Sequence, residues 1–140
     1  VSGRAWVDRE WSSSLLGPEQ KGWDWFSLHL NEREKLMLFR VRDTKSQDYF
    51  SGTLVTEGKG IIKLKNNDFE ITPLAYALNK NTGSNIPIKW KLEIPSQKIS
   101  IITNAINANS FNNGLIPYWE GPISFNGTHE GMGYLEMTGY

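Results

Sequence analysis

Residues 88–94 alternate strictly between apolar and polar side chains. Successive side chains of a β-strand point to opposite faces of a sheet, so this alternation is typical of a strand with one buried and one solvated face. A helix would need an apolar repeat of about 3.6 residues, which the segment lacks. We therefore predict an antiparallel strand at 88–94. Its buried side chains would be Ile88, Trp90, Leu92 and Ile94.

Short apolar or alternating runs recur along the whole chain, separated by turns rich in Gly, Asn and Asp. The segments predicted as strands are 5–11, 23–30, 35–42, 49–56, 60–64, 69–78, 88–94, 99–105, 118–125 and 132–138. Residues 12–21 and 104–113 are predicted loops. About ten short strands indicate an all-β fold. We predict an antiparallel β-barrel of about 8–10 strands, because consecutive hairpins would leave no edge strand.

The composition indicates one neutral domain spanning residues 1–140. A chain of this length buries a sizeable core without covalent cross-links. The absence of cysteine excludes disulfides and thiolate metal sites. The 15 basic and 15 acidic residues cancel, which argues against nucleic acid as a partner. No apolar run approaches the roughly 20 residues of a transmembrane helix, so no transmembrane segment is expected.

Motifs for cofactors and for activated nucleophiles are missing from the sequence. The two histidines, His29 and His129, lie far apart along the chain with no metal-ligand spacing. The glycines form no phosphate-binding pattern ahead of a helix, and no Gly-x-Ser-x-Gly elbow occurs. We therefore expect neither a metal nor another cofactor.

Tryptophans and carboxylates are concentrated near the start of the chain. The residues concerned are Trp6, Asp8, Trp11, Trp23, Asp24 and Trp25. Asp24 would share a strand face with Phe26 and Leu28, where a carboxylate is costly unless it is paired. Two interpretations stay open. Either Asp24 points inward as a neutral acid in an apolar site, or it is held by one of the arginines, for which the candidates are Arg4, Arg9, Arg40 and Arg42.

A second group of candidates lies in the last two predicted strands. Glu120 follows Trp119, and Glu136 would share a strand face with Tyr134 and Thr138. A carboxylate facing hydroxyl groups is either a general acid or a member of a structural hydrogen-bond network. The tryptophans also have two interpretations, because they either fill the core or form an exposed platform for a carbohydrate.

Four motifs follow one another over nearly the whole chain. They are Gly3-x-x-Trp6-x-Asp8-x-x-Trp11, Gly22-Trp23-Asp24-Trp25-Phe26, Tyr118-Trp119-Glu120-Gly121 and Gly133-Tyr134-Leu135-Glu136-Met137-Thr138-Gly139-Tyr140. In this order they resemble the hydroxyneurosporene synthase (carotenoid 1,2-hydratase)/AttH-like family of lipocalin-type proteins. The Gly-x-Trp signature of ordinary lipocalins is replaced here by Gly3-x-x-Trp6.

The resemblance implies a calycin-type barrel that forms the C-terminal half of a protein with two lipocalin-like domains. The N-terminal lipocalin-like domain of the same chain would then be a partner. It also implies a bacterial protein that is secreted, periplasmic or membrane-associated. The hydratase branch of the family adds water across an isolated double bond of a long polyene by protonation and capture of the carbocation by water. The motif positions that carry over are Asp8, Trp11, Trp23, Asp24, Trp119, Glu120 and Glu136.

Four functions are compatible with these residues. The chain would bind a hydrophobic small molecule such as a polyene or isoprenoid, or would be part of a hydratase-type hydro-lyase with Asp24 as the acid. Alternatively, it would be a barrel without a ligand that packs on a partner domain, or a carbohydrate-binding module.

Overall fold

The computed structural model describes Val7, residues 16–114 and residues 117–140. Apart from Val7, the strand predicted at 5–11 lies outside the described residues, as do the candidates Trp6, Asp8 and Trp11 and the arginines Arg4 and Arg9. Ten strands account for most of the described chain. They are β1 (Gln20–His29), β2 (Glu34–Asp43), β3 (Tyr49–Thr56), β4 (Gly60–Lys65), β5 (Glu70–Leu78), β6 (Asn85–Ile94), β7 (Ile99–Ala105), β8 (Phe111–Asn112), β9 (Tyr118–Gly127) and β10 (Gly131–Thr138).

The all-β prediction is confirmed, and each predicted strand within the described residues corresponds to an observed one. Pro95–Gln97 forms a short 3-10 helix between β6 and β7. The predicted loop at 104–113 contains one further strand, the two-residue β8, which pairs with β9. A strand this short produces no alternation that could be recognised in the sequence. Within the described residues, no helix is long and apolar enough to cross a membrane.

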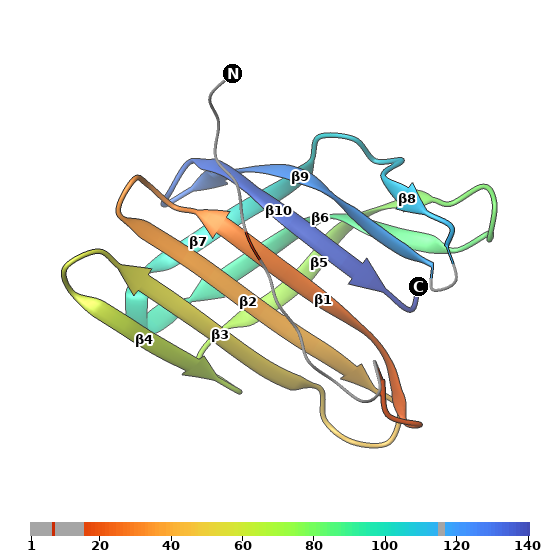
Figure 1. Ribbon diagram of the computed structural model, residues 1–140, viewed down its shortest axis with the longest axis horizontal. Helices are drawn as coiled ribbons and strands as arrows, with labels where there is room; N and C mark the ends of the chain where they lie inside the picture. Colours follow the sequence, from red (N-terminus) through yellow and green to blue (C-terminus); the bar gives the residue numbers. More distant parts are fainter. Residues whose placement is uncertain (1–6, 8–15, 115–116) are drawn as a thin grey trace.

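All ten strands form one antiparallel sheet that curls into a lipocalin-like half-barrel. Its order is β4-β3-β2-β1-β10-β9-β7-β6-β5, with β8 beside β9. The first and last strands, β1 and β10, pair in the middle of this order, where Asp24 is opposite Met137 and Phe26 is opposite Leu135. In Figure 1, β1 to β4 and β10 form the front layer, and β5 to β7 lie behind them.

The sheet ends at β4 and β5, although these strands are consecutive in the chain. Only the turn at residues 66–69 separates them, and Asn67 adopts a left-handed conformation there with φ of 72°. The expectation that consecutive hairpins leave no edge strand is therefore wrong at this one corner. Two strand edges remain within the described chain, one on each side of the seam between β4 and β5.

The concave side of the sheet is filled by packed apolar side chains. Phe26 and Trp90 meet edge to face at its centre, with ring centroids 5.5 Å apart. Leu28, Leu36 and Leu38 are fully buried around them. The predicted inward face of 88–94 is confirmed for Trp90, Leu92 and Ile94. Such packing contributes most of the stability of a domain this size.

Candidate functional site

Asp24 is the one carboxylate among the described side chains that is buried on the concave side of the sheet. It lies on the same face of β1 as Phe26 and Leu28, and its exposed fraction is 0%. The strand alternation predicted at the start of β1 explains this position, because side chains two residues apart share a face. The sequence prediction that Asp24 shares the apolar face is confirmed.

Two arginines of β2 and one tyrosine surround the Asp24 carboxylate. The hydroxyl of Tyr140 donates a hydrogen bond to Oδ1 of Asp24 over 2.6 Å. Nε of Arg42 lies 3.4 Å from Oδ2, and a terminal nitrogen of Arg40 lies 3.8 Å from it. Arg40 also forms a close ion pair with Asp48, at 2.6 Å. The two interpretations of Asp24 are thus not exclusive, because the carboxylate points inward and is paired with arginines there. We call Asp24, Arg40, Arg42 and Tyr140 the mouth cluster.

Burial dominates the electrostatics of the mouth cluster. Removal from water raises the pKa of Asp24 above its ordinary value of 3.8, and the positive charges of Arg42 and Arg40 and the Tyr140 hydrogen bond oppose this shift. Burial also raises the pKa of Tyr140, and the neighbouring Asp24 raises it further. Both side chains are therefore biased toward their protonated forms, which suits groups that hold a proton in a dry site.

Arg42 fixes the last residues of the sequence against β1 and β2. Its guanidinium stacks over the ring of Tyr140 at 3.8 Å from the centroid, and it donates hydrogen bonds to the carbonyl oxygens of Thr138 and Gly139. Gly139 has φ of +80°, and a Cβ there would overlap the carbonyl of Lys21. Glycine is therefore required at this turn, which directs Tyr140 back toward Asp24.

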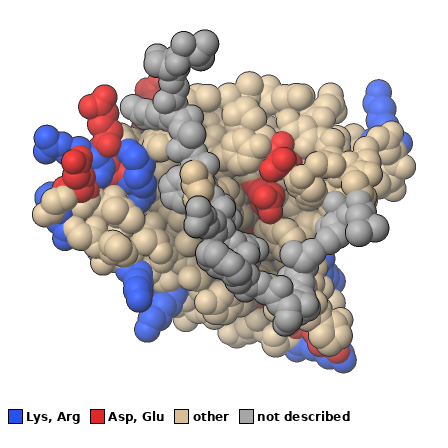
Figure 2. Space-filling model, in the orientation of Figure 1, with Lys and Arg blue, Asp and Glu red and all other residues tan. Residues whose placement is uncertain are grey.

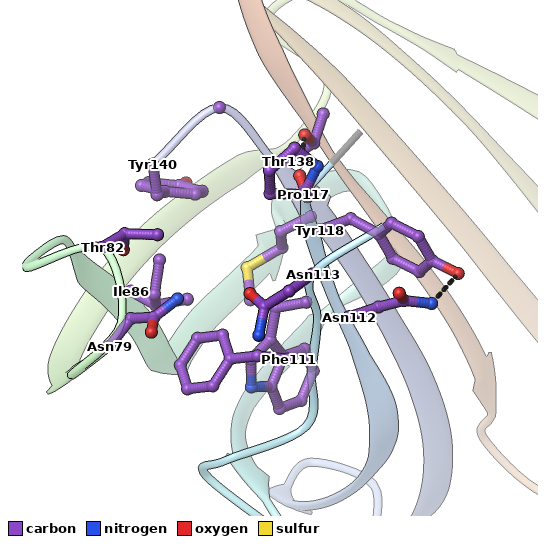
Figure 3. Close-up of a pocket in the computed structure, with 13 residues that line it drawn as sticks. Asn79, Thr82, Ile86, Phe111, Asn112, Asn113, Pro117, Tyr118, Thr138 and Tyr140 are labelled. Atoms are coloured by element: carbon purple, nitrogen blue, oxygen red, sulfur yellow. Dashed lines mark hydrogen bonds between the residues drawn. The ribbon is translucent and has the colours of Figure 1, made fainter. Parts of the chain in front are cut away.

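A pocket opens beside Tyr140 at the same end of the half-barrel, which we call the mouth. Its walls come from the β5–β6 loop with Asn79 and Thr82, from the β8 region with Phe111, and from the end of β10. Figure 3 shows the ring of Tyr140 on one side, and on the other side Asn112, whose amide donates to the hydroxyl of Tyr118 over 2.6 Å. The space inside is about 30 Å³, enough for one or two water molecules.

Trp119 and Met137 form the floor of the pocket. Trp119 is buried, and its indole nitrogen donates to the carbonyl of Ala108 over 3.0 Å. It therefore joins the core to the mouth, which makes it the second sequence candidate, after Asp24, on the concave side. Trp90 is also fully buried. These two tryptophans fill the core, as one of the two interpretations of the tryptophans predicted.

The other described candidates lie together on the convex face, away from Asp24. This outer cluster consists of Trp23, Trp25, Glu120, Tyr134 and Glu136. The indole nitrogen of Trp23 donates to Oε1 of Glu136 over 2.9 Å. Glu136 is opposite Trp25 on one side and Glu120 on the other. Figure 2 shows acidic side chains reaching the surface of this face among uncharged ones.

Tyr134 completes the outer cluster. Partial burial raises its pKa, and the charges of Glu120 and Glu136 raise it further. The prediction that Tyr134 and Glu136 share a strand face agrees with their alternation in β10. Trp23 and Trp25 are half-buried rather than exposed, so neither forms the open, flat platform that a carbohydrate-binding module requires.

Sequence reasoning missed Tyr140 as a partner of Asp24, and it missed the pocket residues Asn79, Thr82 and Phe111. In the sequence, Tyr140 is only the last residue of a motif, 116 residues from Asp24. Pairing between β1 and β10 is what brings the two together. Arg42, by contrast, was among the candidates, because it lies in the hairpin partner of the Asp24 strand.

A curled antiparallel sheet with an apolar concave side and a polar cluster at its mouth is a lipocalin-like domain. Comparison with known families is more specific: the AttH-like family matches residues 1–140, and the chain belongs to that family. None of the curated proteins compared with the chain matches it.

Two solved structures share the fold. A protein of Nitrosomonas europaea described as AttH-type superposes with a TM-score of 0.83 at 23% identity. Kievitone hydratase from Nectria haematococca superposes with a TM-score of 0.77 at 20% identity. Each match covers 93% of this chain and 42% of the other, so the chain spans less than half the length of these structures.

Proposed function

We propose that this domain handles an apolar ligand at its mouth in a hydratase-type protein, with Asp24 as the source of a proton and Tyr140 as the group that delivers it. One observation carries the proposal: a fully buried carboxylate is joined by a 2.6 Å hydrogen bond to a hydroxyl whose ring lines a pocket. Membership in the AttH-like family and the fold shared with a hydratase agree with it.

The chemistry needs a neutral acid, because an isolated alkene is a weak base. In the proposed step the hydrogen bond between the two side chains first reverses, so that protonated Asp24 donates to the Tyr140 oxygen. Tyr140 then gives its hydroxyl proton to an alkene carbon as it receives the proton of Asp24. The π electron pair forms the new C–H bond, and the carbocation that results is captured by water. The water then loses a proton to the Tyr140–Asp24 pair, which restores the starting state.

The surroundings of Asp24 suit both halves of this cycle. Burial raises its pKa and so keeps a proton available. Once the proton has left, Arg42 and Arg40, at 3.4 Å and 3.8 Å, stabilise the carboxylate. The charge that develops on the ligand is then balanced by an anion held nearby.

The test uses kievitone and neurosporene as probes, with mass spectrometry to detect a product heavier by one water. Asp24→Asn and Tyr140→Phe should each lower the hydration rate by roughly 10²–10⁴-fold. Saturable quenching of tryptophan fluorescence by the same probes should persist, since Asp24 does not line the pocket and Tyr140→Phe keeps the ring that does. Glu136→Gln, a carboxylate change on the convex face, is the matched control and should keep the wild-type rate. Full turnover in Asp24→Asn would remove this residue from the mechanism.

A binding domain without chemistry is the second candidate. The ion pairs of Asp24 with Arg42 and Arg40 favour it, because two positive charges also suit a carboxylate that stays ionised and only holds the mouth together. Saturable quenching without any hydrated product from either probe would select this function.

A further inference from the structure

The two edge strands of the sheet differ in what they present to the outside. On β4, the outward side chains are Ile61, Lys63 and Lys65. Lysines at an edge prevent other chains from pairing with it, because docking would bury their charge. On β5 the one charged residue is Glu70 at its start, and the segment from Ile71 to Asn79 carries none. The β5 edge therefore lacks the protection that β4 has.

Large apolar side chains occupy the outward face of β5. Leu74, Tyr76 and Leu78 alternate with more buried residues and have exposed fractions of 45%, 55% and 55%. We call these three residues the β5 stripe. Single exposed apolar residues are common on protein surfaces, but three at alternate positions of a strand whose only charged residue is Glu70 at its start mark an interaction surface.

The β5 stripe leads directly to the mouth. Leu78 is the last residue of β5, and the next residue, Asn79, lines the pocket together with Thr82 of the same loop. A partner that packed on the stripe would therefore also stand over one wall of the pocket. Pockets of this kind are frequent where two domains meet.

We infer that the β5 stripe is the docking surface for the remaining domain of a longer chain, and that docking closes the mouth pocket. The two solved structures described above are more than twice as long, since each match covers 93% of this chain but only 42% of theirs. A second domain covalently linked to this one is present at a high effective concentration, so a modest apolar stripe suffices for stable contact. The docking surface does not depend on the acid role of Asp24.

The geometry of β5 also indicates how the partner packs. Pro73 has no backbone N–H, and the pairing of β5 with β6 is irregular from Pro73 to Tyr76. An edge with a missing donor and a bulge is a poor template for strand addition. The partner surface that fits is therefore an uncharged, apolar one that packs against side chains, rather than a strand that extends the sheet.

The test compares Leu78→Asp with Ile61→Asp in the full-length protein. Both changes place a carboxylate on the outer face of an edge strand, and Ile61 is the more exposed of the two, at 65%. In Leu78→Asp we expect the melting curve to separate into two transitions and the amides of β5 and the β5–β6 loop to exchange at least tenfold faster. Ile61→Asp should retain a single transition and wild-type exchange.

Two results would overturn the inference. One is that Leu78→Asp and Ile61→Asp behave alike in melting and exchange. The other is that the 140-residue chain alone forms a dimer in sedimentation that Leu78→Asp dissociates, since the occupant of the stripe would then be a second copy. Full hydration activity in Asp24→Asn with an unchanged melting curve would overturn the proposed function and leave the docking surface in place.

Discussion

The mouth cluster and the outer cluster contain similar residues in opposite environments. Each has carboxylate and tyrosine side chains close together, and both involve β1 and β10 or its end. In the mouth cluster the carboxylate of Asp24 is fully buried and meets two arginines and a hydroxyl. In the outer cluster Glu136 is half-buried and accepts a hydrogen bond from Trp23. The two faces of one sheet thus give the carboxylates of Asp24 and Glu136 very different environments.

The comparison shows that a sequence motif can locate a group of functional residues, but the burial of each side chain determines its chemical properties. Trp23, Asp24 and Trp25 are adjacent in the sequence, yet the tryptophans lie on the convex face and Asp24 on the concave one. Desolvation governs the pKa of Asp24, whereas solvent screens the charges of the outer cluster. Substitutions in the two clusters should therefore have effects of different size on stability.

The largest effect is expected for Arg42→Met. This change removes the closest positive charge from the buried Asp24 and releases the carbonyl groups of Thr138 and Gly139. Removing one partner of a buried ion pair lowers the free energy of unfolding by about 3–5 kcal/mol. Urea unfolding should show a loss of this order. A loss below about 1 kcal/mol, the range of surface ion pairs, would mean that Asp24 is not held by Arg42.

A pH-dependent effect of intermediate size is expected for Asp24→Asn. The pKa of Asp24 is higher in the folded chain than its ordinary value of 3.8, so its contribution to stability is present below 3.8 and is lost as the pH rises through the folded value. The free energy of unfolding of Asp24→Asn relative to the wild type should therefore increase as the pH rises above about 4.

Urea unfolding at a series of pH values measures this difference. Asp43, whose pKa is lowered by hydrogen bonds from the backbone of Lys45 and Ser46, acts in the opposite direction but is present in both proteins and cancels. If the difference in the free energy of unfolding between Asp24→Asn and the wild type stayed constant from about pH 4 to about pH 8, burial would not control the pKa of Asp24.

The smallest effect is expected for Trp23→Phe on the convex face. The ring is retained in part, and the hydrogen bond to Glu136 is lost. A hydrogen bond of this kind contributes about 0.5–1.5 kcal/mol. Thermal unfolding should show a modest decrease, and hydration of the probes should be unchanged. A loss comparable to that of Arg42→Met would show that the two clusters are equally important for stability.

The sequence predicts the strands well because the alternation of side chains survives in nearly every one of them. Residues 49–56 and 99–105 were predicted with the observed bounds. The sequence could not predict the seam between β4 and β5, since the turn at 66–69 resembles an ordinary hairpin turn. Only the curvature of the whole sheet separates the two strands.

The candidate site was predictable only where the partners lie in neighbouring strands. Pairing of Asp24 with Arg40 or Arg42 follows from the β1–β2 hairpin, in which Asp24 is directly opposite Arg40. Tyr140 and the pocket walls come from distant segments, and their meeting depends on the closure of the sheet. Local patterns contain no information on that closure.

The pairing of β1 with β10 also has a consequence for the order of folding. Trp23 and Glu136 are separated by 113 residues, and Asp24 and Tyr140 by 116. Hairpins such as β1–β2 and β9–β10 close short loops and can form early, whereas the contact between β1 and β10 must wait until the intervening chain is arranged. We therefore expect the mouth to be assembled in the last step of folding. Detachment of β10 would disassemble it first, so a protein that keeps most of its sheet could already have lost its site.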